Sequence, residues 1–404
     1  MVLLPVFYLI VQLVLHSVIA ASTSSSGRCI GPIEVKSNQD LDKLRSCQVM
    51  EGSIAIKNIS SFGEIMNLSQ LQHVHGDLVF ENNEDLSQVV LAGLKQVDGK
   101  LAFQNNRNLE RLDLTQLTGV QALDISVEPA LTAIQFPSGL SQIESLTVTD
   151  TLVTKIEGLA TSKIKDVHIA NNKYLKDINM NHLQQVNGVM TIAANSPNLT
   201  MDLSSLSSIY QADFRGLAQL AGLNRVHQIT GDLSFVANFF SSLSLPNITQ
   251  IAGTLTVSNN LQLQNLSVPQ LQLLGGALSL TNNTDLSNVS VPKLQQVDGT
   301  VDITGNFDKV DLPNLVDIRG GLNVQTSSTQ FSCDDGVNKL QGGVTKGHEF
   351  TCKSNVSNPT STIGHNSTTN ATGYDYASSS SKISLSQTII LASNFILIYL
   401  ALIK

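Results

Sequence analysis

The chain has 404 residues, of which 42% are hydrophobic and 14% are charged, and its formal net charge is -8. An acidic chain without a stripe of Lys and Arg lacks the electrostatic footprint of a nucleic-acid-binding protein. It also lacks the polybasic patch that binds anionic lipid. We therefore expect no nucleic-acid partner.

Residues 1–20 predict a signal peptide. The run from Val2 to Ile19 is almost wholly apolar and leads into the small residues Ala20 and Ala21, which form a cleavage pattern. We expect cleavage after Ala20, and cleavage after Ala21 is nearly as favourable. Because no Lys or Arg precedes the apolar run, a membrane-anchoring N-terminal helix remains the alternative.

Segment 21–52 follows the signal peptide and contains two of the four cysteines, Cys29 and Cys47. It precedes a long series of repeats, and we interpret it as an N-terminal cap. An open stack of repeats exposes apolar layers and strand edges at both ends, and a disulfide-closed loop over an end protects them.

Residues 53–330 contain a repeat with a period of about 23 residues. The strongest copies begin with a glycine that precedes an alternating apolar triplet: Gly76, Gly99, Gly188, Gly231, Gly253, Gly276 and Gly299. Weaker copies start their triplets at Ile54, Leu123, Leu146, Val167, Ala212 and Leu322. A fixed period in the twenties is typical of a solenoid, whose units stack to share one core.

The triplets predict strands. In Leu78-Val79-Phe80, as in the other copies, two apolar residues flank a residue that faces outward, the pattern of a strand with one face buried. A second short apolar pattern with a proline, as in Val291-Pro292-Lys293-Leu294, suits a turn between short strands better than a helix. We therefore expect an all-β solenoid, a parallel β-helix of about thirteen coils.

An asparagine stands three residues beyond the last apolar position of the triplet in many coils. We expect these side chains to stack as a structural ladder, bonding the backbone of their own turn and of the next coil. Asparagine also tolerates the left-handed backbone of a sharp corner. The ladder comprises Asn83, Asn106, Asn172, Asn195, Asn238, Asn260, Asn283 and Asn306.

The central triplet positions predict a polar face on the parallel sheet. Its candidate binding residues are Thr147, His168, Thr191, Asp213, Ser234, Thr256, Ser279 and Asp302. Carbohydrate-cleaving β-helices need clustered carboxylates or metal ligands. At about 4.8 Å per coil, Asp124 and Asp213 would lie ~20 Å apart. We therefore expect no enzyme activity and no catalytic residue.

His73 and His75 flank a turn and are the candidate metal ligands. No carboxylate or cysteine accompanies them at the spacing of a ligand set, so we interpret them as solvated turn residues. We expect no bound metal and no other cofactor.

Segment 331–353 contains Cys333 and Cys352 and predicts a C-terminal cap. A nested pairing, Cys29 with Cys352 and Cys47 with Cys333, is the alternative to two local disulfides. The stack of coils would separate the nested partners by ~60 Å. The expected fold therefore requires the local pairs, Cys29 with Cys47 and Cys333 with Cys352.

The chain has many Asn-x-Ser/Thr sequons. In a secreted chain their attached glycans must lie on the surface. The acceptor residues are Asn58, Asn67, Asn198, Asn247, Asn265, Asn282, Asn288, Asn355, Asn366 and Asn370.

The end of the chain predicts a stalk and a lipid anchor. Residues 354–379 are rich in Ser, Thr and Asn, which is typical of a disordered, O-glycosylated stalk. Residues 380–404 combine a polar spacer with a short apolar tail, the signal for a glycosylphosphatidylinositol (GPI) anchor. We expect attachment at Ser379, with Ser378 and Asn370 as alternatives.

These features together resemble the fungal GPI-anchored cell-wall organisation and sporulation protein family. The copies at Gln96–Asn106 and Gln296–Ile303 carry the resemblance most clearly. The body is similar to the receptor L domain of growth-factor receptors, a leucine-rich right-handed β-helix. The coils of Leu123, Leu146, Val167 and Ala212 depart from the pattern because they lack the glycine.

The resemblance implies a place on the outer leaflet of the plasma membrane and in the cell wall. It implies a role in the organisation of the vegetative wall or the spore wall, without a defined chemical activity, and cell-wall glucan is a candidate partner. The alternative function is a binding module that recognises a protein partner or a wall glycan through its sheet face.

Overall fold

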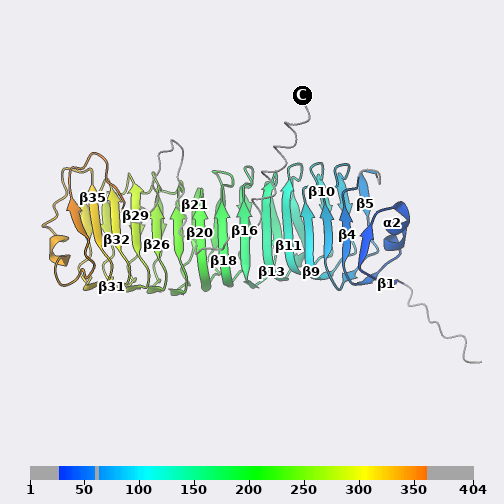
Figure 1. Ribbon diagram of the computed structural model, residues 1–404, viewed down its shortest axis with the longest axis horizontal. Coiled ribbons are helices and arrows are strands. Elements are labelled where there is room, and N and C mark those ends of the chain that lie inside the picture. Colours follow the sequence, from blue (N-terminus) through cyan, green and yellow to red (C-terminus); the bar gives the residue numbers. More distant parts are fainter. Residues whose placement is uncertain (1–26, 60–62, 362–404) are drawn as a thin grey trace, which may run out of the picture. The chain divides into compact units, whose positions relative to one another are not determined.

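The computed structural model describes residues 27–59 and 63–361, which form a stack of β-coils. All thirteen predicted triplets lie on parallel strands, so the predicted all-β solenoid is confirmed. Figure 1 shows these strands side by side, with every arrow pointing the same way from the first coils (blue) to the last (orange). Leu78 and Phe80 are buried and Val79 between them is partly exposed, as the alternation predicts.

Each coil contains up to three short strands. The first strands are β1 (Arg28–Ile30), β3 (Val49–Glu51), β6 (His73–Val74), β15 (Lys163–Ile164), β22 (Gln228–Ile229), β25 (Gln250–Ile251), β28 (Leu273–Leu274), β31 (Gln296–Val297) and β34 (Asp317–Ile318). The second strands, which hold the triplets, are β2 (Ile33–Val35), β4 (Ile54–Lys57), β7 (Leu78–Glu81), β16 (Asp166–Ala170), β23 (Leu233–Val236), β26 (Leu255–Ser258), β29 (Leu278–Asn283), β32 (Val301–Gly305), β35 (Leu322–Thr326) and β36 (Phe350–Lys353).

In some coils the first and second strands are continuous. These longer strands are β9 (Gln96–Gln104), β11 (Gly119–Glu128), β13 (Gln142–Thr151), β18 (Gln185–Ala193) and β20 (Ser208–Arg215). The third strands form smaller parallel groups: β5 (Ile65–Asn67), β8 (Gln88–Val90), β10 (Arg111–Asp113), β12 (Ile134–Leu140), β14 (Lys155–Leu159), β17 (Asp177–Ile178), β19 (Thr200–Leu203), β21 (Gln219–Gly222), β24 (Ser242–Ser244), β27 (Asn265–Ser267), β30 (Asn288–Ser290) and β33 (Lys309–Asp311).

The structure explains why some coils lack the glycine. Where β9 pairs with β11, the register shifts between Val120 and Ala122. Four positions separate Val97 from the triplet at Leu101, but only three separate Val120 from Leu123. The glycine thus marks the extra residue of a bulge, and coils that lack it have one residue fewer between the first-strand and second-strand positions.

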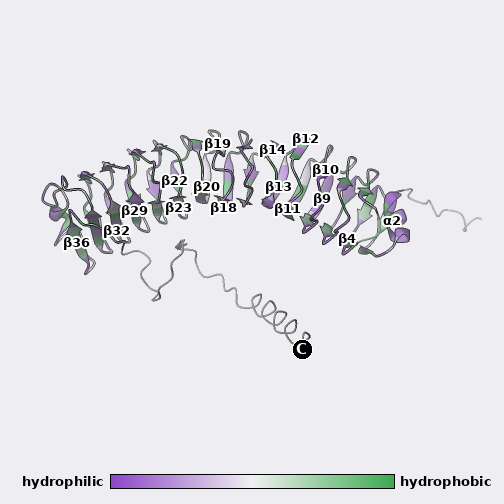
Figure 2. Ribbon diagram, turned by 90° about the horizontal axis from the view of Figure 1, so that it is seen from above, coloured by the Kyte–Doolittle hydropathy of each residue, from purple (hydrophilic) through white to green (hydrophobic). Residues whose placement is uncertain are grey.

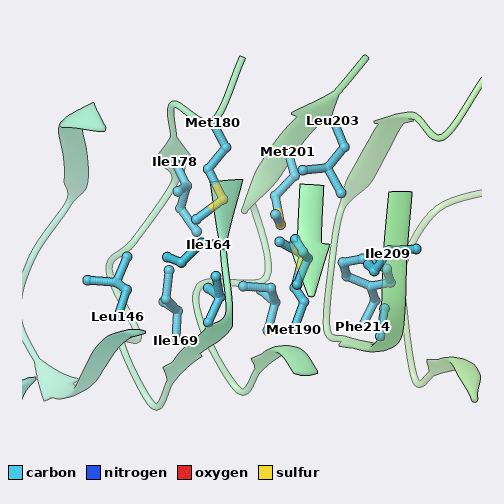
Figure 3. Packing of buried hydrophobic residues seen from close by; sticks show 14 of the residues in the cluster. Leu146, Ile164, Ile169, Ile178, Met180, Met190, Met201, Leu203, Ile209 and Phe214 are labelled. Atoms are coloured by element: carbon cyan, nitrogen blue, oxygen red, sulfur yellow. The ribbon is translucent and has the colours of Figure 1, made fainter. Parts of the chain in front are cut away.

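One hydrophobic core runs through the stack, and all three strands of a coil contribute to it. Figure 3 shows Ile164, Ile169 and Ile178, one from each strand of a coil, meeting in the interior. Phenylalanines of neighbouring coils stack there as well, with ring centroids of Phe80 and Phe103 5.0 Å apart. Since every coil buries its apolar residues against the next, the fold depends on stacking.

A cap closes each end, and the local disulfide pairing is confirmed. At the N-terminal end, helix α2 (Asn38–Arg45) begins after Ser37, whose hydroxyl accepts the backbone N–H of Asp40, and it buries Leu41 and Leu44. The Cys29–Cys47 disulfide joins this helix to β1. At the other end, the Cys333–Cys352 disulfide links the segment before the 3-10 helix η1 (Asn338–Leu340) to β36.

The body curves along its length. Figure 2 shows the second strands, for example in β11, β18 and β23, on the inner side of the arc, and the third strands β12, β14 and β19 on the outer side. None of the helices within the described residues is long and apolar enough to cross a lipid bilayer.

Candidate functional site

The eight predicted binding residues form one continuous row on the second strands. Each is paired in register with the next, from Thr147 beside His168 to Ser279 beside Asp302. Parallel pairing without a register change at these positions stacks identical places of successive coils about 4.8 Å apart. We call Thr147, His168, Thr191, Asp213, Ser234, Thr256, Ser279 and Asp302 the face row.

The last two members of the face row are not accessible, which differs from the expectation. Ser279 is 7% exposed and Asp302 is fully buried. Beyond β36 the chain returns across β35, where the Thr360 carbonyl accepts hydrogen bonds from Asn323 Nδ2 (2.9 Å) and Gln325 Nε2 (3.2 Å). Asn323 Nδ2 in turn donates to Asp302 Oδ1 at 3.0 Å. The accessible part of the face row therefore runs from Thr147 to Thr256.

The carboxylates near the face row are paired with cations. Asp213 accepts from Arg215, with Nη2 to Oδ2 at 2.8 Å, and Asp124 accepts from Lys100 Nζ at 2.6 Å. Asp124 and Asp213 stand four coils apart, from β11 to β20, or ~19 Å. Glycosidase carboxylates lie within about 10 Å of each other, so these two do not form such a pair.

The described glycosylation acceptors lie away from the face row. Asn67, Asn265 and Asn288 belong to the third strands β5, β27 and β30. Asn282 lies near the end of second strand β29, three residues beyond Ser279. The remaining ones lie at corners or turns, and these acceptors and Asn282 are all exposed: Asn58, Asn198, Asn247 and Asn355. Glycans at these positions would leave the sheet face open. Asn366 and Asn370 lie outside the described residues.

The asparagine ladder joins each coil to the coil before it. Asn106 Oδ1 accepts from the backbone N–H and from Nδ2 of Asn83, at 3.1 and 2.9 Å. Its own Nδ2 donates to the Phe80 carbonyl at 3.1 Å. Asn172 with Asn195, and Asn238 with Asn260 and Asn283, repeat this geometry. These hydrogen bonds satisfy buried backbone groups at a corner of the coil, where no neighbouring strand pairs with the backbone.

Two details of the ladder differ from the expectation. The left-handed backbone belongs to the residue before the ladder asparagine, for example Asn82 (φ 55°) and Asn105 (φ 57°). Asn306 is exposed and outside the row, because Gly305 rather than Asn306 pairs with Asn283. The hydroxyl of Thr326 takes over there, accepting from the Phe307 N–H at 3.0 Å and donating to its carbonyl.

Glu128 occupies a ladder position that the search for asparagine missed. It stands three residues after Ile125, so the same count that finds the asparagines would have found it. Its Oε1 accepts from Asn106 Nδ2 at 2.8 Å, while no hydrogen-bond donor among the described residues reaches the buried Oε2. Burial raises the pKa of Glu128 to about 8, despite opposing hydrogen bonds from Asn106.

One group of metal-ligating side chains comes together among the described residues: His73, His75 and Asp98. His73 Nε2 lies 2.9 Å from Asp98 Oδ1, and His75 Nδ1 lies 2.7 Å from Asp98 Oδ2. The sequence showed the two histidines but not the carboxylate, because Asp98 belongs to the following coil. The predicted lipid-attachment residues Ser379, Ser378 and Asn370 lie outside the described residues.

Comparison with known proteins gives relatives that match most of the chain. It is 35% identical over 360 residues to "Cell wall protein ecm33" of Schizosaccharomyces pombe, covering 87% of this chain and 82% of that protein. It is 31% identical over 353 residues to "Cell surface GPI-anchored protein ECM33" of Candida albicans, covering 87% and 77%. It is 28% identical over 313 residues to "Sporulation-specific protein 2" of Saccharomyces cerevisiae, covering 77% and 62%. No family model and no solved structure matches the chain.

Proposed function

The chain belongs to the Ecm33 family of fungal cell-wall and GPI-anchored cell-surface proteins, and we propose on this basis that it is a non-enzymatic glycoprotein. In this function it contributes to the organisation and integrity of the vegetative wall or the spore wall. The observation that carries the proposal is that the match to the fission-yeast cell wall protein extends over 87% of the chain. It therefore includes most of the solenoid.

The chemistry of the solenoid supports a structural role. Asp213 is paired with Arg215 and Asp124 with Lys100, and the two aspartates are too far apart to act on one bond. A stack of coils with one continuous core and closed ends is a stiff scaffold, well suited to hold glycans in the wall.

Anchoring by lipid is supported by relatives that are named GPI-anchored cell-surface proteins. We propose that the lipid is attached at Ser379, or at Ser378 or Asn370. In that arrangement the signal peptide (1–20) and the segment 380–404 are removed, and residues 354–379 form the stalk. The first residues of that stalk contact the body, since Thr360 packs against Gln325.

A second candidate function is binding of a partner protein or wall glucan at the face row. The accessible residues from Thr147 to Thr256 lie on the inner side of the arc. The described glycosylation acceptors lie elsewhere, so the row is open to a partner. Hydroxyl, imidazole and carboxylate groups in a row 4.8 Å apart can bond a repetitive polar ligand.

Deletion of the gene tests the wall function. We expect deletion strains to become sensitive to wall-perturbing agents or to form defective spores, and the full chain to restore growth. Wild-type behaviour of the deletion strain under both conditions would contradict the wall function.

Two arginine variants separate scaffolding from binding at the face row. Thr191→Arg with Thr256→Arg places bulky charges on the row, and Ser244→Arg places one on exposed third strand β24 as the control. If the face binds a partner, the double variant fails to restore the deletion strain although it reaches the surface at normal levels, and Ser244→Arg restores it. Full rescue by both variants would leave the scaffold alone as the function.

A further inference from the structure

We propose that His73, His75 and Asp98 form a binding site for a late first-row divalent metal ion such as Zn²⁺. Their ligand atoms all lie within 4.8 Å of one another. Two imidazole nitrogens and a carboxylate oxygen are a donor set that zinc takes in proteins, with water in the remaining position. This inference is independent of the proposed function in the wall.

The fold brings the three ligands together from two coils. His73 and His75 are two positions apart at β6, so both side chains leave the same face of the chain. In the next coil Gln96 pairs with His73 and Val97 with Val74. One position further along both strands, Asp98 therefore stands beside His75. Its carboxylate contacts both rings, whose centroids are 3.9 Å apart.

Neighbouring side chains support the three ligands in the way that metal sites require. Gln96 Nε2 donates to Asp98 Oδ1 at 2.7 Å and so orients the carboxylate. Glu51 Oε1, in the preceding coil, lies 4.0 Å from His75 Nε2, on the far side of the ring from Asp98. At that distance Glu51 makes no hydrogen bond to the ring, but its negative charge favours a cation nearby. Arg28 holds Glu51 in place through a 2.9 Å ion pair.

The site is open to solvent. The exposed side-chain fractions are 28% for His73, 35% for His75 and 36% for Asp98, so an ion could enter directly.

The donor types decide which ions fit. Imidazole favours Zn²⁺, Cu²⁺ and Ni²⁺, whereas Mg²⁺ and Ca²⁺ take oxygen ligands. A set with two nitrogens therefore selects the former class. Such an ion would join β6 to β9 near the N-terminal cap, and we expect it to stabilise those coils by binding the folded state alone.

Isothermal titration of the purified protein with ZnCl₂ at neutral pH tests the site. We expect one Zn²⁺ per chain, no competition from MgCl₂, and a raised melting temperature. His73→Ala, His75→Ala and Asp98→Asn should each weaken binding about tenfold or more. His168→Ala removes an exposed histidine on β16 and is the matched control.

Several results would overturn the site. They are no heat with the wild-type protein, undiminished binding in the His73→Ala/His75→Ala double variant, or equal loss in His168→Ala. Circular dichroism shows whether each variant folds. Because Asp98→Asn keeps both histidines and the shape of the side chain, it tests the carboxylate even if the double variant is unstable.

Discussion

At the scale of single residues, Glu128 departs most from the repeat. A carboxyl group takes the place of an asparagine in a fully buried row, and it accepts from Asn106 with only one of its two oxygens. An ionised carboxylate there would keep an unsatisfied, buried oxygen, which is costly. The protonated form avoids this charge, in agreement with a pKa raised to about 8.

The pH dependence of stability follows from this residue. Its folded-state pKa is about 8 and the ordinary value is 4.5, so between these values the folded state binds more protons than the unfolded state. The contribution of Glu128 to the free energy of unfolding is fully present below pH 4.5. It is lost as the pH rises toward 8, by about 1.4 kcal/mol per pH unit.

Glu128→Gln tests this prediction. The amide keeps the acceptor for Asn106 and adds an N–H in place of the acid, so we expect the variant to be more stable than wild type at pH 7.5. Its free energy of unfolding should also vary less with pH between 5 and 8. Denaturant titrations at several pH values measure both. Glu144→Gln, at an exposed carboxyl, should leave the pH dependence unchanged, and a Glu128→Gln variant that keeps the wild-type slope would refute the assignment.

The sequence predicted which residues form the ladder better than it predicted their backbone conformation and contacts. The count of three from each triplet located Asn83, Asn106 and the other ladder residues except Asn306, because the period of the repeat fixes their place. It could not show that Asn82 and Asn105 take the left-handed backbone. Nor could it show that Thr360 returns to cover Asp302 and Asn323, or that Asp98 meets His73. These contacts join different coils or distant segments, and no local pattern encodes them.

At the scale of the coil, the recurring glycine is required by the coil before it. A Cβ atom added at Gly276 would lie 2.6 Å from the backbone carbon of Gly253 and 2.6 Å from Thr254 Oγ1. Gly299 and Gly320 meet the preceding glycine in the same way. The glycines therefore stack in a column that lets the bulges of successive coils approach closely.

Gly276→Ala tests the column. Because backbone atoms, which cannot rotate aside, occupy the space of the new methyl group, we expect a loss of about 1–3 kcal/mol in the free energy of unfolding. Gly343→Ala is the control, since its added Cβ would have no atom within 4 Å, and it should change stability by less than about 0.5 kcal/mol. Equal stability of the two variants in chemical denaturation would show that the column does not restrict packing.

The element pattern was the part of the fold that the sequence predicted best. All triplets became strands, because alternation of buried and exposed residues is a local property. In the coils without the glycine, the register of the strands was harder to predict from the sequence. The structure shows that they lack one bulge residue, so that three positions rather than four separate Val120 from Leu123.

At the scale of the molecule, the body has two chemically different sides. The predicted glycosylation acceptors among the described residues lie on third strands, at corners and, for Asn282, near the end of β29, and the face row lies on the second strands at the inner side of the arc. Caps with disulfides close the two ends of the stack. This arrangement fits a surface protein whose glycans face the wall while its sheet stays available to a partner.

Release of the protein from intact cells tests the proposed place at the surface most directly. The measurement compares a chain tagged after Ala21 before and after treatment with phosphatidylinositol-specific phospholipase C, with a glucan-degrading enzyme as the parallel treatment. We predict release by the phospholipase, with any fraction transferred to the wall released by the glucanase. Resistance to both enzymes, with extraction only by detergent, would mean a protein segment in the membrane and would contradict the lipid anchor.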